Sequence, residues 1–330
     1  MKGFHVVHAA CVSPIVDVLT EAGAPVERLL RQCRLDRFRL DDPDAFLPAE
    51  YVHRFFEIVA RKETGSSLPE AITSRYILAN MGGFGTELMA LTDLRAVISF
   101  ACLPEVRQMS YEDASWSVQG ERARFVDGFK APPSLSRAWF GHLTLCLMID
   151  GFKAAAGSDW VPTAVFVDAE LPQSIESLLS NETVVKSGAG AVGIAFPTEM
   201  LALSMTGFEN VENGTGRAPK LEPSAAVRIE AVLDASKDTL LPTLVSVSNL
   251  FNMSPRSLQR RLDAEGMTFF QVVDGWRCNR ALKAVTDPAL KIGEIAENLR
   301  YSDTAHFTRA FKRRTGIPPQ SFRERQAALA

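Results

Sequence analysis

The 330-residue sequence contains no apolar run that approaches the roughly 18 to 20 residues of a membrane-spanning helix. Its first residues, MKGFHVVHAACV, hold one lysine and too short an apolar stretch for a secretion signal. We therefore expect a cytoplasmic protein that has no membrane partner.

Cysteines are few and widely scattered, at Cys11, Cys33, Cys102, Cys146 and Cys278. Their number is odd and no pair has the CxxC spacing, which argues against a disulfide framework and against a zinc site. We expect reduced thiols with mostly structural roles.

The sequence is also poor in the patterns of enzymes and cofactor sites. His5, His8 and Cys11 have a spacing that can gather three metal ligands on a short helix, but a structural N-terminus is the favoured interpretation. The stretch SGAGAVGIAFP at 187–197 lacks the GxGxxG pattern and a following lysine, so it predicts a turn into a strand. No nucleophile, base or metal set converges in residues 1–205. We expect no enzyme, no metal and no cofactor.

The net charge of -3 conceals a division along the chain. Residues 224–330 carry 16 Lys and Arg against 11 Asp and Glu, whereas residues 1–223 carry 20 against 28. A basic C-terminal third on an acidic body is typical of a nucleic-acid-binding module, although an asymmetry of this size also arises by chance.

Length and a hydrophobic fraction of 46% predict two domains. Residues 209–223, ENVENGTGRAPKLEP, contain two glycines and two prolines and no apolar periodicity, which indicates a linker. We therefore predict a first domain at 1–208 and a second at 224–330.

The first domain has a mixed pattern. Apolar residues at helical spacing predict helices near 13–33, 48–63, 85–102 and 135–157, the third as one continuous helix. Strand-like patterns predict a hairpin around Gly120 and buried strands at 163–169 and 191–197. We expect an α/β fold with a mixed sheet and long helices, followed by an all-α second domain.

A short unit occurs twice in the second domain, at an offset of 48 residues. VSNLFNMSPRSLQRRL aligns with IAENLRYSDTAHFTRAF, so that Ser254 matches Ser302. Each copy has a short helix with small or apolar residues, a tight turn, a serine expected as N-cap and an amphipathic helix. This is the helix-turn-helix pattern, predicted at about 243–266 and 291–316 and joined by a helix at about 268–286.

Helical angles separate an inward from an outward face in each second helix. Leu258 and Leu262 face inward in the first copy, as do Phe307, Ala310 and Phe311 in the second. The outward faces carry Arg, Gln, His and Thr, which suit the major groove of DNA. For one isolated helix a solvated charged face is the better explanation, but the duplication at fixed spacing favours a nucleic-acid-reading surface.

Residues 224–325 resemble the DNA-binding domain of AraC/XylS-type transcriptional regulators. Two segments carry the resemblance: SPRSLQRRLDAEG and IAENLRYSDTAHFTRAFKRRTGIPPQSFR. The resemblance implies base contacts from Arg256, Gln259, Arg260, Thr304, Ala305, His306 and Arg309. We also predict phosphate contacts from Ser254, Ser257, Ser302, Thr308, Lys312 and Arg313.

Two positions depart from that family. Asn252 and Arg300 occupy the place of its usual turn glycine; asparagine tolerates the left-handed conformation, whereas Arg300 there costs on the order of 1 kcal/mol, or the turn differs slightly. On the connecting helix, we expect Trp276 in the core and Arg277 in an ion pair.

Residues 12–205 resemble, more loosely, the effector domain of a subgroup of these regulators, labelled arabinose-binding by similarity. The likeness implies a bacterial, effector-responsive activator of a catabolic operon, with promoter DNA, RNA polymerase and a small organic metabolite as partners. Trp116, Trp139 and His142 are candidates for an effector pocket, although each is better explained as core. The domain can instead, or also, form a homodimer; an effector-independent regulator and, less favoured, an enzyme are the alternatives.

Overall fold

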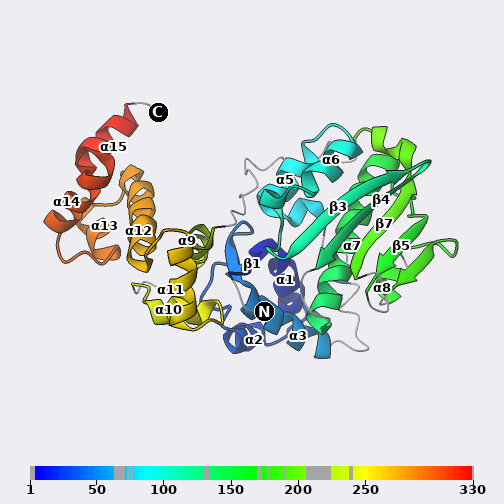
Figure 1. Cartoon of the computed structure of the whole chain (residues 1–330), viewed down its shortest axis with the longest axis horizontal. Helices are drawn as coiled ribbons and strands as arrows, with labels where there is room; N and C mark the ends of the chain where they lie inside the picture. The colour runs from blue at the N-terminus through cyan, green and yellow to red at the C-terminus, as the bar shows by residue number, and fades with distance from the viewer. Residues whose placement is uncertain are drawn as a thin grey trace. The chain divides into compact units, whose positions relative to one another are not determined.

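The computed structural model describes residues 4–62, 71–72, 75, 77–129, 134–168, 173–176, 178–188, 190–205, 224–237 and 241–328. The chain divides into two compact units (Figure 1). Unit 1 comprises Met1 and His5–Glu222, and unit 2 comprises Lys2–Phe4 and Pro223–Ala330. The predicted linker at 209–223 lies outside the described residues. Within the described parts of the chain, no helix is long and apolar enough to cross a membrane.

Unit 1 combines two sheets with helices, as the sequence predicts. Its helices of seven or more residues are α1 (Ser13–Glu21), α2 (Val26–Cys33), α3 (Ala49–Lys62), α5 (Gly82–Met89), α6 (Leu94–Ala101) and α7 (Leu135–Ala156). Shorter ones are η1 (Ala9–Cys11), η2 (Leu78–Asn80), η3 (Pro104–Val106), α8 (Gln173–Glu176) and η4 (Thr198–Ala202).

The strands form a two-stranded antiparallel sheet and a mixed five-stranded sheet. The first pairs β1 (Val6–His8) with β2 (Phe46–Pro48). The second has the order β3 (Glu112–Gln119), β4 (Arg122–Phe129), β7 (Ala191–Pro197), β5 (Ala164–Val167) and β6 (Val184–Ser187) (Figure 1). Only the β5–β6 pair in it is parallel. The predicted hairpin, both buried strands and the mixed sheet are therefore confirmed.

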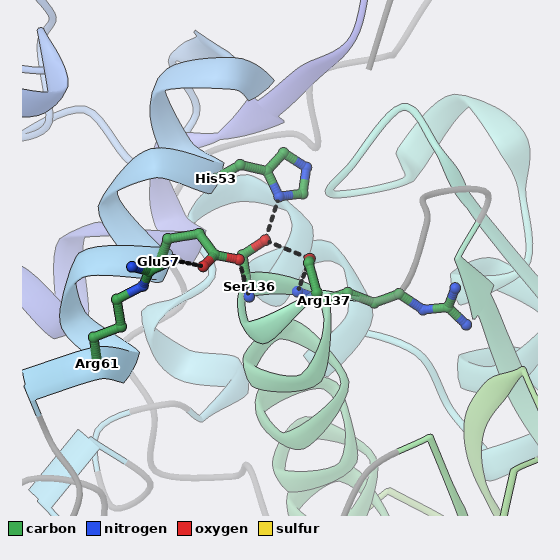
Figure 2. A network of polar contacts seen from close by, with 6 residues as sticks. His53, Glu57, Arg61, Ser136 and Arg137 are labelled. Atoms are coloured by element: carbon green, nitrogen blue, oxygen red, sulfur yellow. Dashed lines mark hydrogen bonds and ion pairs between the residues drawn. The ribbon is translucent and has the colours of Figure 1, made fainter.

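A polar network fixes the start of the long helix α7 against α3 (Figure 2). Ser134 caps α7 by accepting a hydrogen bond from the Arg137 N–H. Glu57 accepts one from the Ser136 N–H at 3.1 Å, and the Ser136 hydroxyl lies 2.8 Å from His53 Nδ1. These contacts satisfy N–H groups that a helix leaves open at its first turn.

The continuous helix expected at 85–102 is instead two helices, α5 and α6. Asp93 is extended at the break and caps α6 by accepting a hydrogen bond from Ala96 N at 2.9 Å. The segment beside it bonds to a distant part of the chain, because Leu94 N donates to Leu203 O and Met205 N to Thr92 O. Asp93, a good N-cap residue type inside the apolar pattern, is thus the sequence signal for a new helix start, which the apolar periodicity alone did not reveal.

Unit 2 is helical throughout its described residues. Its helices are α9 (Ala225–Ala235), α10 (Leu244–Leu250), α11 (Pro255–Ala264), α12 (Phe269–Thr286), α13 (Ile292–Asn298), α14 (Thr304–Thr315) and α15 (Pro319–Ala327) (Figure 1). Thr268 and Gln271 form a capping box that begins α12. The α/β and all-α fold classes expected from the sequence are both observed.

Long-range contacts tie the ends of the unit 2 helices together. The Glu265 carboxylate, just after α11, accepts hydrogen bonds from Ala225 N and Ser224 Oγ at the start of α9. Arg323 in α15 donates to the Val285 carbonyl near the end of α12 and to the Leu290 carbonyl in the loop between α12 and α13. These bonds satisfy groups that helix termini expose. At the N-terminal end of the chain, the Phe4 ring packs edge-on against Phe251, 5.0 Å between centroids.

Candidate nucleic-acid interface

The first helix-turn-helix unit consists of α10 and α11, and its serine cap is where the sequence predicts it. Ser254 Oγ accepts a hydrogen bond from Ser257 N at 3.1 Å, and Pro255 occupies the first helical position, where no N–H is needed. Leu258 and Leu262 are fully buried, as expected from their stripe. The opposite side of α11 is therefore left to solvent.

The second unit consists of α13 and α14, and its cap differs from the prediction. Asp303, not Ser302, is the N-cap, because its carboxylate accepts the His306 N–H at 2.6 Å. Ser302 instead donates its hydroxyl to Asp303 and lies 3.1 Å from His306 Nδ1. The hydrogen bond from His306 N, followed by that from Ser302, lowers the pKa of Asp303. A carboxylate at a helix N-terminus also meets the positive end of the helix dipole, which favours Asp303 over the serine.

Both turns use a left-handed residue that is not glycine. Asn252 has φ of 51° and Arg300 has φ of 57°, so both take the left-handed conformation implied by the glycine that the resembled family usually has at this turn. The second unit therefore has the same left-handed turn as the first. At Arg300 this conformation is less favourable than it would be for glycine, because arginine has a Cβ atom.

The outward faces of α11 and α14 carry the predicted base-reading residues. All of these are exposed: Arg256, Gln259, Arg260, Thr304, Ala305, His306 and Arg309. Of the predicted phosphate-contacting residues, Ser254, Ser302, Lys312 and Arg313 are exposed, and Ser257 and Thr308 are half-buried. Phe307 and Phe311 are buried beneath the α14 face, and Ala310 is half-buried. Arginine and glutamine on an exposed helix face can donate paired hydrogen bonds to guanine or adenine edges.

Helix α12 supports the second unit from below. Trp276 is buried, as predicted, and donates its indole N–H to Asp234 at 3.0 Å. Where an ion pair was expected for Arg277, its guanidinium donates two hydrogen bonds to the Leu299 carbonyl and stacks on the Tyr301 ring at 3.9 Å. The prediction that Arg277 has a structural role stands, but its acceptor is a backbone carbonyl.

Unit 1 contains a cavity of about 90 Å³. Apolar side chains from α5, α6 and α7, including Phe84, Ile98 and Phe152, form much of its wall. The floor is one face of the β3–β4 hairpin, where Glu112 and Asp127 are buried. Such an apolar hollow with a few polar groups is the usual form of a small-molecule site.

Burial determines the protonation of the two carboxyl groups in the cavity. It raises the pKa of Glu112 well above its usual range, and the nearby Asp127 raises it further. Burial also raises the pKa of Asp127 to about 7, although the hydrogen bond from Asp113 N and the charge of Arg107 lower it. A cation close to both groups would offset this cost of ionisation.

The aromatic residues proposed from the sequence for an effector pocket lie elsewhere in unit 1. Trp116 is half-buried on β3 with Arg95 above its ring, 5.5 Å from the centroid. Trp139 is half-buried on α7, and His142 lines a separate hollow of about 10 Å³ beside the Arg137–Asp168 ion pair. None of Trp116, Trp139 and His142 lines the larger cavity.

The N-terminal histidines have structural surroundings. His8 is buried against the Phe46 ring at 4.3 Å, and burial lowers its pKa to about 3. His5 Nδ1 lies 3.3 Å from Ser110 Oγ. Among the residues that the structure describes, no three His, Cys, Asp or Glu side chains form a group that could hold a metal ion.

Sequence reasoning missed the polar residues of the cavity. Alternation along β4 buries Ala123, Phe125 and Asp127 on one face. A carboxylate in the inward register of such a strand is the signal that points to this site.

Comparisons with known proteins agree with this geometry. Residues 23–205 match the family described as the arabinose-binding domain of AraC transcription regulator, N-term, and residues 247–325 match the helix-turn-helix domain family. An uncharacterized HTH-type transcriptional regulator of Mycobacterium tuberculosis is 25% identical over 338 residues, which cover 97% of this chain and 96% of that protein.

Two further similarities have different extents. The transcriptional activator AggR of Escherichia coli is 31% identical over 80 residues, which cover 24% of this chain and 30% of that protein. The crystal structure of the transcriptional regulator CdpR from Pseudomonas aeruginosa covers 94% of this chain and 96% of its own, at 18% identity and a TM-score of 0.41. The two family matches and the names of the Mycobacterium tuberculosis and Escherichia coli relatives confirm the prediction of a regulator over that of an enzyme.

Proposed function

The chain belongs to the AraC family of DNA-binding transcription regulators, and from that premise we propose that it activates a catabolic operon in response to a small organic metabolite bound by unit 1. The observation that carries the DNA-binding part is the duplicated helix-turn-helix unit, which exposes Arg and Gln on α11 and Thr, His and Arg on α14. The apolar cavity with buried carboxyl groups supports the effector part.

Several finer roles belong to the same proposal. Arg256, Gln259, Arg260, Arg309 and their neighbours on the two faces read base edges, while the serines, Thr308, Lys312 and Arg313 bind phosphates. As an activator, a role that the relative AggR has by name, the protein contacts RNA polymerase at its promoter. It acts in the cytoplasm, as a monomer or as a homodimer formed through unit 1.

Binding to the promoter region of its own or a neighbouring operon tests the DNA-reading role. Arg260→Ala and Arg309→Ala should each relax sequence preference and cost roughly 1 to 3 kcal/mol on the specific site. Arg325→Ala is the matched control, because it removes the same charge from an exposed position on α15. Unchanged affinity and preference in both test variants would overturn the assignment of the two faces.

Transcription from the same promoter, measured with and without the protein, tests the sign of regulation. Higher output with the protein supports activation, and lower output contradicts it. A broad panel of metabolites, screened by thermal shift, tests whether unit 1 responds to an effector at all. No hit would favour a regulator that works independently of any effector.

A further inference from the structure

The polar end of the 90 Å³ cavity has more acceptors than the protein satisfies. Gln108 is 8% exposed; its Nε2 donates to the Val106 carbonyl, but its Oε1 has no hydrogen-bond partner among the described residues. A buried carbonyl oxygen without a donor is unfavourable, and a ligand donor would remove that cost.

Two carboxyl groups lie at the same end. Ala114 pairs with Asp127 across the hairpin, so Glu112, two residues before Ala114 on β3, is the diagonal neighbour of Asp127 on the same face. Diagonal side chains in an antiparallel pair are about 7 Å apart, close enough for one small group to lie between them. Glu112 accepts the Met109 N–H and Asp127 the Asp113 N–H, and each carboxylate keeps further lone pairs.

The charges nearby leave this end acidic. Arg107 lines the cavity, but its guanidinium is paired with Asp113 at 3.1 Å. The Arg107 Nε–H has no partner of its own among the described residues. An anionic ligand could accept it, yet would meet both Glu112 and Asp127. A cation is favoured instead, because pairing with it would stabilise the ionised form of each buried carboxyl group.

We propose that this cavity is the effector site and that it takes a short aliphatic primary amine, whose ammonium group lies among Gln108, Glu112 and Asp127. An ammonium has three donors, which match these three acceptors. Leu88, Ile98 and Phe152 hold the alkyl chain. A cavity of about 150 Å³ holds benzene, so about 90 Å³ suits a ligand of roughly four or five non-hydrogen atoms. This inference rests on the proposed function of unit 1.

Calorimetric titration of the full chain at neutral pH with three ligands that share a four-carbon chain tests the inference. The ligands are n-butylamine, which is protonated at this pH, n-butanol and butyrate. Hydrogen bonds to charged groups are strong enough that the amine should bind at least about tenfold more tightly than the alcohol. Butyrate should bind most weakly. Equal binding of amine and alcohol, or tightest binding of butyrate, would overturn the proposal.

Variants locate the ammonium group. Glu112→Gln and Asp127→Asn keep an acceptor for the backbone N–H that each residue binds, and Gln108→Met removes the unpartnered oxygen. Each should weaken n-butylamine by about tenfold while leaving n-butanol within about twofold. Glu121→Gln, an exposed carboxylate at the tip of the same hairpin, is the matched control. If all three variants bind the amine as the unaltered protein does, the site is elsewhere and the inference is wrong.

Promoter binding by the same preparations separates this inference from the proposed function. Amine binding that changes promoter affinity supports the effector role, whereas amine binding that leaves it unchanged refutes that role. Specific promoter binding without amine binding refutes the inference alone. If the unaltered protein shows no specific promoter binding, either with the amine or without it, the regulator function itself is refuted.

Discussion

The guanidinium of Arg277 holds the carbonyl oxygen of Leu299 with two hydrogen bonds, of 3.1 Å from Nε and 2.9 Å from Nη2. Leu299 is the last residue before the left-handed Arg300, so this contact joins helix α12 to the turn between α13 and α14. Tyr301, on the other side of the turn, lies against the flat face of the same guanidinium. The position of α14 therefore depends on a residue that is not on the proposed DNA-reading face.

Arg277→Ala should weaken specific promoter binding without changing which sequence is preferred. The variant loses two charge-assisted hydrogen bonds and the stacking on Tyr301, which destabilises unit 2 by roughly 1 to 3 kcal/mol. Chemical denaturation and promoter titration measure the two effects. Arg277→Lys should restore little, since an ammonium cannot reproduce the paired geometry. A variant with altered base preference would show instead that Arg277 contacts DNA directly.

Arg300→Gly should stabilise unit 2. A residue with a Cβ costs about 1 kcal/mol in the left-handed region, and glycine removes that cost at φ of 57°. Asn252→Gly should gain less, because asparagine tolerates this conformation. Arg300→Ala separates the effect of the backbone conformation from that of the arginine side chain. Because alanine retains the Cβ, this variant should not stabilise unit 2. If Arg300→Gly lowers the free energy of unfolding, the arginine side chain contributes more than the turn strain costs.

Lys312→Ala and Arg309→Ala should differ in kind. Lys312 lies about one turn after Arg309 on α14 and is proposed to bind phosphate. Its loss should weaken binding to all DNA sequences about equally, and it should reduce the slope of log affinity against log salt concentration by about one. Arg309 is proposed to read a base, so its loss should fall mainly on the specific site. Binding measured at several salt concentrations, on specific and unrelated fragments, distinguishes them. Equal effects of both variants on both fragments would contradict this division of roles.

Local signals predicted unit 2 well because its motifs are short and duplicated. Contacts within a few residues account for the apolar stripe ending at Leu262 and for the Thr268–Gln271 capping box. The left-handed turns at Asn252 and Arg300 were expected from the resemblance to a family that usually has glycine there. The prediction that Ser302 caps α14 was wrong, because serine and aspartate are adjacent there and both residue types are good N-caps. The sequence order alone did not show that Asp303 would be preferred.

Unit 1 depends on contacts between distant residues, and the predictions were less complete there. The break at Asp93 depends on pairing with residues near 204, which periodicity does not detect. Strand alternation predicted the hairpin around Gly120, but not which helices would cover its inner face. The cavity is formed by the packing of α5, α6 and α7 over that face, which the sequence did not reveal. The prediction from aromatic content alone selected Trp116, which does not line the cavity.

His53 should make unit 1 less stable as the pH falls. Burial is the main cause that lowers the pKa of His53 to about 4 from its usual 6.5. The unfolded chain therefore binds a proton near pH 6.5 that the folded protein accepts only near pH 4. Stability from this group is fully present above pH 6.5 and is lost as the pH falls towards 4, with a slope of up to about 1.4 kcal/mol per pH unit.

His53→Gln isolates that contribution. An amide can still hydrogen-bond to the Ser136 hydroxyl but does not titrate, so the variant's free energy of unfolding should fall less steeply between pH 6.5 and 4. Asp127 acts in the opposite direction, since its raised pKa of about 7 makes acidification between pH 7 and 4 stabilising. Only the difference between variant and unaltered protein therefore reports on His53. His306→Gln, an exposed histidine in unit 2, is the control. Equal slopes in His53→Gln and the unaltered protein would mean that the imidazole takes up its proton equally well in both states.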